Sequence, residues 1–332
     1  MADSPFDLDN PLAYQHWRDA KRASHPTHAR ELLVNVADPR DLSDVELQSL
    51  LQCCATSNMV IYRSAVIAED KNIPLQLARQ LGLHRLDGNW LADEDGVSQI
   101  EVASPASPPT ALRTGPSKGE HSAWGGPAPI GSRTAFIPYT NRAIRWHTDG
   151  YYHPRSRQIR AMVLHCVRSA AAGGENALMD HEMAYIAVRE ANPDWLRALM
   201  ASDAMTIPER LDDDGVARAE QSGPVFSVDP DDGMLHMRYT ARTRSVVWKD
   251  DALTRAAVAF LQNLLDSAGP HMFRLRLEPG MGLVCNNVLH DRAGFVDDVR
   301  QPRLLYRARY LDRVRPPHQA ASVALQERSV VQ

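Results

Sequence analysis

The feature that most constrains the fold is a series of short strand-like segments that are not separated by regularly spaced helices. Runs of apolar residues bounded by turn residues predict strands at 59–62, 97–102, 159–167, 176–179, 272–277, 282–285 and 304–311. Apolar residues at helical spacing predict helices over 44–54, 75–81, 180–187, 195–200 and 253–265. Because regular βαβ alternation is missing, we expect a mainly β fold, with a double-stranded β-helix (jelly-roll) core and inserted and flanking helices.

Composition excludes several classes of protein. The 332 residues are 44% hydrophobic and 23% charged, as in globular proteins, and the net charge of −4 gives no basic excess for nucleic acid or anionic membrane. The four cysteines form no C-x-x-C pair, which favours a reducing cytoplasm over a disulfide framework or a thiolate zinc site. No stretch approaches 18 apolar residues, and the first 16 residues include no apolar leader core. We therefore expect a cytoplasmic protein that contacts neither nucleic acid nor membrane; homo-oligomer formation stays open.

We expect one domain over residues 1–332, with residues 313–332 as a tail. Residues 104–133 are rich in proline, glycine and serine, so a regular element is excluded there. This segment leads directly into the strand that carries the candidate metal ligands. Two interpretations follow, a passive surface loop or a mobile lid that orders when substrate binds; we expect the lid.

A candidate metal site begins with the tripeptide His147-Thr148-Asp149. Residues i and i+2 of an extended segment face the same side, so the imidazole and the carboxylate can approach one metal ion. His290 is the candidate third ligand, because it directly follows an apolar strand expected over 282–289. Two histidines and one carboxylate on one face of an octahedron leave three positions open, as in non-haem Fe(II) oxygenases. Structural zinc and a hydrolytic metal-bound water are the alternatives.

The last expected strand carries arginines at alternating positions, Arg303, Arg307 and Arg309. Residues at this spacing share one face of a strand. If that face points outward, water solvates the charges; if it points inward, the charges need an anionic partner such as a dicarboxylate. Both orientations are compatible with the strand alone.

Four ordered motifs carry a resemblance to a known family. They are His147-Thr148-Asp149, Gly173-Gly174-Glu175-Asn176, Asn287-Val288-Leu289-His290-Asp291-Arg292 and Arg303-Leu304-Leu305-Tyr306-Arg307. In this order they resemble the taurine dioxygenase (TauD/TfdA) superfamily of Fe(II)/2-oxoglutarate-dependent dioxygenases, over roughly residues 30 to 312. The resemblance implies a dioxygenase that uses Fe(II), 2-oxoglutarate and O₂, releases succinate and CO₂, and oxidises an unactivated C–H bond of a small polar molecule.

The same resemblance implies roles for single residues. His147, Asp149 and His290 would bind Fe(II), so the metal centre itself would be the catalytic group. Arg307 would hold the distal carboxylate of 2-oxoglutarate, and Arg303 would approach the carboxylate that chelates the metal. Two further residues have roles that follow from these: Asn176 stands where relatives often have a threonine donor to the distal carboxylate, and Arg309 is a reserve for either arginine.

Aromatic residues next to the candidate ligands suggest a substrate wall. Trp146, Tyr151 and Tyr152 flank the His147-Thr148-Asp149 tripeptide. Packing in the barrel core explains them equally well, since most aromatic side chains are buried for that reason. As a wall they would present hydroxyl groups or aromatic faces to a small polar substrate, whose identity the sequence does not give.

Overall fold

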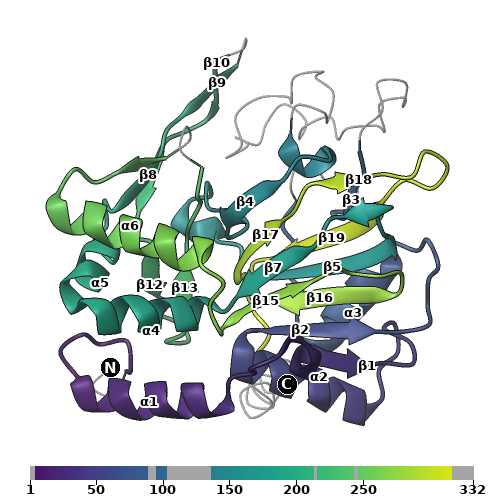
Figure 1. The fold of residues 1–332 in the computed structure, drawn as a ribbon, viewed down its shortest axis with the longest axis horizontal. Coiled ribbons are helices and arrows are strands. Elements are labelled where there is room, and N and C mark those ends of the chain that lie inside the picture. The colour runs from purple at the N-terminus through teal and green to yellow at the C-terminus, as the bar shows by residue number, and fades with distance from the viewer. Residues whose placement is uncertain (1–3, 89–94, 103–135, 213–214, 243–245, 316–332) are drawn as a thin grey trace, which may run out of the picture.

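The computed structural model describes residues 4–88, 95–102, 136–212, 215–242 and 246–315 (Figure 1). The expected lid at 104–133 and residues 316–332 of the expected tail lie outside the described residues. The single-domain organisation stays a prediction.

Two facing sheets form the centre of the described chain. The larger sheet has the order β1 (Leu33–Asn35), β2 (Met59–Arg63), β16 (Met281–Cys285), β5 (Ala161–Arg168), β19 (Leu304–Tyr310) and β3 (Ser98–Ile100). The smaller sheet has the order β15 (Met272–Leu275), β7 (Asn176–Met179), β17 (Leu289–Arg292) and β4 (Ile144–His147). Only the β1–β2 pair is parallel within these two sheets. Apolar residues from both sheets, including Leu178 and Leu305, form one buried cluster between them. This sandwich confirms the expected jelly-roll fold class.

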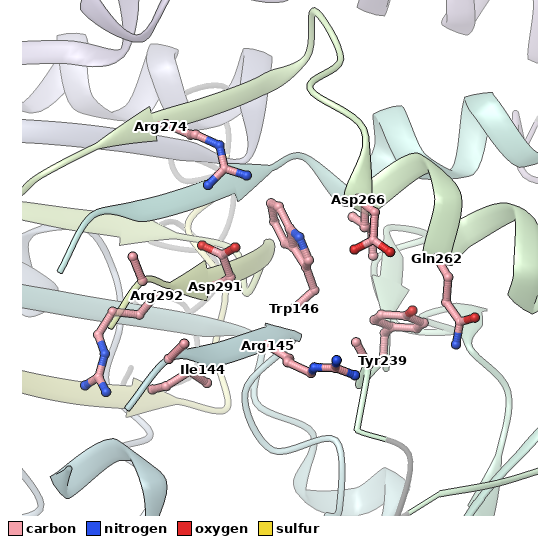
Figure 2. Close-up of a pocket in the computed structure, with 13 residues that line it drawn as sticks. Ile144, Arg145, Trp146, Tyr239, Gln262, Asp266, Arg274, Asp291 and Arg292 are labelled. Atoms are coloured by element: carbon pink, nitrogen blue, oxygen red, sulfur yellow. The ribbon is translucent and has the colours of Figure 1, made fainter. Parts of the chain in front are cut away.

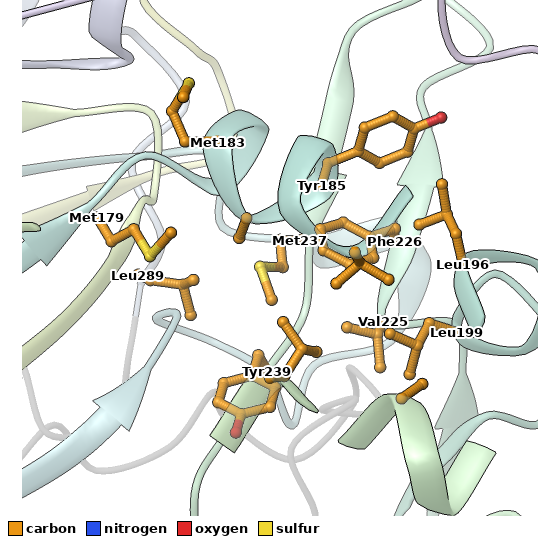
Figure 3. Packing of buried hydrophobic residues seen from close by; sticks show 14 of the residues in the cluster. Met179, Met183, Tyr185, Leu196, Leu199, Val225, Phe226, Met237, Tyr239 and Leu289 are labelled. Carbon is orange, nitrogen blue, oxygen red and sulfur yellow. The ribbon is translucent and has the colours of Figure 1, made fainter. Parts of the chain in front are cut away.

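Helices cover the outer faces of both sheets (Figure 1). They are α1 (Pro11–Ser24), α2 (Asp44–Ser57), α3 (Asn72–Gln80), α4 (His181–Ala191), α5 (Pro193–Leu199) and α6 (Ala252–Asp266). Apolar residues of α2 and α3 pack on the larger sheet. A methionine- and aromatic-rich cluster joins α4, α5 and α6 to the smaller sheet (Figure 3). Among the described helices, none has the length and apolar character needed to cross a membrane.

Short strands complete the fold around the sandwich. A hairpin of β9 (Arg210–Asp212) and β10 (Gly215–Arg218) projects beyond β8 (Figure 1). The other small sheets are β11 (Gln221–Gly223) with β8 (Met205–Ile207) and β14 (Val247–Trp248), β12 (Phe226–Val228) with β13 (Leu235–Met237), and β18 (Phe295–Val296) with β6 (Ala172–Gly173). Among the described residues, 3₁₀ turns span Ala29–Leu32, Ile137–Tyr139 and Arg155–Arg157.

One expected strand is wrong in a way that matters for the site. The apolar run 282–289 is two strands, β16 and β17, which belong to different sheets. Asn287 between them has φ 52°, a left-handed backbone conformation that asparagine tolerates better than most residues. The chain therefore crosses from one sheet to the other here, and His290 lies within β17 instead of after a single long strand.

The central strands approach so closely at Gly282 that a side chain should not fit. A Cβ atom there would lie 2.3 Å from the carbonyl oxygen of Leu164 and 2.3 Å from the Tyr62 ring. We predict that Gly282→Ala lowers the free energy of unfolding by about 2 kcal/mol, because backbone and ring must both shift. Urea unfolding measures this, with Gly269→Ala as the control, since nothing lies within 4 Å of a Cβ at Gly269. Equal midpoints for the two variants would contradict the close packing.

Candidate metal centre

Two neighbouring strands of the smaller sheet bring the expected triad together. His147 ends β4 and lies directly opposite His290 of β17 in the strand register. Asp149 follows two residues later, beyond the strand end, and its Oδ1 lies 3.8 Å from the His147 Nε2. One donor atom from each residue lies within 4.8 Å of the other two. This spacing allows one metal ion to contact all three.

The backbone fixes which nitrogen each imidazole offers. The Nδ1 of His147 lies 2.9 Å from the carbonyl oxygen of Arg145, and the Nδ1 of His290 lies 2.9 Å from that of Val288. A carbonyl only accepts, so each Nδ1 carries the proton and each Nε2 keeps a lone pair for a metal. Burial lowers the pKa of His147 to about 3, so this imidazole is neutral at pH 7.

Asn287 holds the backbone of Asp149 in place. The Asp149 N–H donates to the Asn287 Oδ1 at 2.7 Å, and the Asn287 Nδ2 donates to the Asp149 carbonyl at 2.9 Å. A second donation from Nδ2, at 2.6 Å, reaches the carbonyl of Ile159. The sequence motif contains Asn287, but sequence reasoning gave it no role. The sequence offered one signal of this role: an asparagine, which tolerates positive φ better than most residues, stands three positions before His290.

The charge of Asp149 is stabilised from the facing sheet. Burial by itself would raise the pKa of this carboxyl, but the positive charges of Arg307 and Arg309 outweigh burial and hold the pKa well below its usual range. The Arg307 Nη1 lies 3.4 Å from both carboxylate oxygens of Asp149. A carboxylate that stays ionised is a ready metal ligand.

Three buried donors near the triad have no hydrogen-bond partner within the part of the chain that the structure describes. They are the Arg303 Nη1, the Arg307 Nε and the Asn176 Nδ2. Arg307, on β19, and Arg303, the residue before that strand, are 8% and 5% exposed, so neither charge lies on an outer, solvated face. Arg303 lies near the β7 end of this space, because its Nε is 3.8 Å from where a Cβ on Gly174 would stand. Buried N–H groups without partners are costly, so this arrangement fits an anionic ligand.

Arg309 differs from Arg303 and Arg307 because none of its buried donors lacks a partner among the described residues. Its Nη2 pairs with the buried carboxylate of Asp87 at 2.6 Å, and its Nη1 donates to the Tyr152 hydroxyl at 3.2 Å. Asp87 also pairs with Arg157 at 2.8 Å. Arg309 is therefore engaged in holding Tyr152, and it does not supply a further donor without a partner.

The three expected wall residues have different surroundings in the structure. Tyr152 lies beside Arg309, and the Tyr151 ring packs edge-on against the Tyr152 ring, with ring centroids 5.3 Å apart. Trp146 is buried within the cluster on the outer face of the smaller sheet, and both tyrosines pack partly against the same cluster. Trp146 also lines a cavity of about 430 Å³, in which Figure 2 shows it with Tyr239 and Asp266. Adjacent residues of a strand point to opposite faces, so the structure does not bring Trp146 and His147 together.

The arrangement as a whole fits a reactive metal with a chelating anion. Three donors on one side of a site leave positions open, whereas structural zinc normally has four protein ligands. Among the described residues, the triad is the one set of histidine, cysteine and acidic side chains with metal-ligand spacing. The donor set of two imidazoles and one carboxylate suits Fe(II).

Comparison with known proteins gives one matching family model. The model, described as "Taurine catabolism dioxygenase TauD, TfdA family", matches residues 119–309. This range contains every residue of the triad, and also Arg303 and Arg307, which each have one buried donor without a partner among the described residues.

Two curated relatives share part of the chain. A uridine-5'-phosphate dioxygenase of an Amycolatopsis species is 33% identical over 177 residues, which cover 50% of this chain and 60% of the relative. A second one, from a Streptomyces species, is 30% identical over 191 residues, covering 54% and 65%. The chain thus spans less than two thirds of the length of these relatives.

A solved structure has the same fold. A taurine dioxygenase from Burkholderia xenovorans superimposes with a TM-score of 0.52 at 16% identity, over 86% of this chain and 89% of that one.

Asn287 offers a test of the site that leaves all three donor side chains unchanged. We predict that Asn287→Ala weakens Co(II) or Fe(II) binding by about tenfold to a hundredfold, because Asp149 loses its backbone support. Isothermal titration under anaerobic conditions measures this, with the exposed Asn263→Ala as the control. Unchanged metal affinity in Asn287→Ala would remove this residue from the metal centre.

Proposed function

The chain belongs to the TauD/TfdA family of dioxygenases, and on that premise we propose that it is an Fe(II)- and 2-oxoglutarate-dependent dioxygenase acting on a small molecule. The proposal rests chiefly on one observation: buried donors of Arg303, Arg307 and Asn176 without partners among the described residues accompany a triad of two imidazoles and a carboxylate. When bound, Fe(II) and 2-oxoglutarate supply O₂ activation and oxidation of a C–H bond, with release of succinate and CO₂.

The residues of this chain bind and orient. His147, Asp149 and His290 would hold Fe(II) through two Nε2 atoms and a carboxylate oxygen. Both imidazoles keep their orientation through the Nδ1–H bonds to backbone carbonyls, and Asn287 keeps Asp149 at the same point. Preorganised ligands leave little reorganisation for the reaction itself.

The geometry favours an order of the two arginines opposite to the one expected from the sequence. Arg307 contacts Asp149, so it lies at the metal end and would meet the carboxylate that chelates the metal. Arg303 lies four residues away, about 13 Å along an extended strand. It would therefore bind the distal carboxylate of 2-oxoglutarate together with Asn176, whose amide Nδ2 is a donor.

The same donors distinguish this proposal from its alternatives. A structural zinc site or a hydrolase with a metal-bound water would use the triad. Neither would supply a hydrogen-bond acceptor for the buried donors of Arg303 and Asn176. A dicarboxylate would pair with Arg307 through one carboxylate and with Arg303 and Asn176 through the other. On the substrate side, Tyr151 and Tyr152 would form part of the wall, and the intact Asp149 favours hydroxylation or a related oxidation over halogenation.

The triad can be tested by spectroscopy before any substrate is known. We predict that anaerobic addition of Fe(II) and 2-oxoglutarate gives a weak visible charge-transfer band, and that His147→Ala, Asp149→Ala and His290→Ala each abolish it. The folded state of each variant is checked by circular dichroism. A wild-type protein that binds Fe(II) but forms no band with 2-oxoglutarate would contradict the proposed function.

The order of the arginines can be tested by comparing two variants. We predict that Arg303→Leu and Arg307→Leu each weaken 2-oxoglutarate binding by roughly thirtyfold, because a charge-assisted pair in a buried site is lost. Arg307→Leu should also change the affinity for Fe(II), because it removes a positive charge 3.4 Å from the Asp149 carboxylate, whereas Arg303→Leu should leave that affinity unchanged. Arg255→Leu, on the exposed side of α6, is the control. A loss of Fe(II) affinity only in Arg303→Leu would restore the order expected from the sequence.

A further inference from the structure

The β9–β10 hairpin carries two arginines directly opposite each other. In its register, Arg218 of β10 pairs with Arg210 of β9. Side chains of directly paired residues share one face of a hairpin, and like charges in such a pair destabilise it. The hairpin therefore places two guanidinium groups close together, next to a shift in the strand register between Val216 and Arg218.

Arg218 is held in a partly buried position with limited compensation. Its Nη2 donates to the carbonyl of Pro208, whereas its Nε is buried without a hydrogen-bond partner. Within the part of the chain that the structure describes, no carboxylate forms an ion pair with Arg218. Burial lowers the pKa of this guanidinium, and the charge of Arg210 lowers it further. A desolvated cation of this kind gains most from an anion that arrives with a ligand.

Tyr152 connects this charge to the metal centre. The Arg218 guanidinium lies 5.7 Å from the centroid of the Tyr152 ring, and the hydroxyl of the same side chain accepts from Arg309. Arg309 lies two residues after Arg307 on β19, and the Arg307 Nη1 is 3.4 Å from both carboxylate oxygens of Asp149. The Tyr152 side chain thus lies between the hairpin arginine and Arg309.

The backbone of the neighbouring Tyr151 is held by the side chain of Arg238. Arg238 donates to the carbonyl of Tyr151 at 2.6 Å, and also to the carbonyls of Met205 at 2.9 Å and Gln221 at 2.6 Å. These bonds tie the tyrosine pair to β8 and β11, next to the hairpin. Arg238 therefore holds the backbone of the tyrosine pair in place beside the hairpin.

We propose that Arg218 and Arg210, with Tyr152 beside them, bind a phosphate monoester group of the substrate, so that the substrate is a phosphorylated small molecule. A phosphate monoester carries about two negative charges at neutral pH, which match two guanidinium groups, whereas a carboxylate or a sulfonate carries one. The inference rests on the proposed dioxygenase function and names the substrate class of the same site. The curated relatives are themselves named for a nucleoside 5'-phosphate.

The experiment compares each phosphate ester with its dephosphorylated partner. Uridine 5'-phosphate and uridine, then ribose 5-phosphate and ribose, are titrated by calorimetry into the protein loaded with Fe(II) and 2-oxoglutarate under anaerobic conditions. The wild type should bind at least one phosphate ester roughly tenfold or more tightly than its partner. Arg218→Gln should remove this preference, and Arg218→Lys should restore part of it. The exposed Arg255→Gln on α6 should keep it in full.

The outcomes separate this inference from the proposed function. The charge-transfer band of Fe(II) with 2-oxoglutarate requires no substrate, so it should form in the wild type and in Arg218→Gln alike. A wild type without the band would overturn the proposed function and, with it, this inference. If the band forms and no phosphate ester binds more tightly than its partner, the inference alone is overturned. The same holds if Arg218→Gln keeps the full preference for phosphate.

Discussion

The charge of Asp149 is the constraint on which the rest of the site depends. A carboxylate buried between two sheets is stable only with positive charge and hydrogen bonds around it. Arg307 and Arg309 supply the charge from β19, and Asn287 fixes the backbone from the crossover between β16 and β17. Three segments far apart in the sequence must therefore be correctly placed before the triad exists. The metal centre is a product of the whole sandwich.

The two faces of the smaller sheet have opposite characters, and strand alternation separates them. On the inner face, His147 and His290 lie opposite each other across β4 and β17. On the outer face, Trp146 and Leu289 join a cluster of methionine and aromatic side chains under the helices. Figure 3 shows Leu289 in this cluster. The apolar face anchors the strands rigidly, and the polar face presents the donors. Each histidine therefore stands next to a residue that packs in the core, which limits its movement.

The positive charges around the site have different partners and hence different uses. Arg309 pairs with Asp87, a carboxylate that is 1% exposed and that also pairs with Arg157, and it donates to the Tyr152 hydroxyl. Arg303 and Arg307 keep buried donors that protein atoms among the described residues do not satisfy. Arg218 has one backbone acceptor and a like charge across the hairpin. Donors that are paired with protein atoms hold the site together, whereas the buried donors without a partner among the described residues can bind a ligand.

The sequence by itself determined the fold class, most of the main helices and strands, and the ordered motifs that contain His147, Asp149 and His290. These are local properties, set by apolar periodicity, caps and short spacings. Only the tertiary structure decided that Arg307 meets Asp149, that Asp87 engages Arg309, that Asn287 supports the triad and that Trp146 turns away from it. Such contacts join residues 138 to 222 positions apart, and they depend on strand register and sheet packing, in which a shift by one residue reverses every side chain. No local pattern in the sequence records that register.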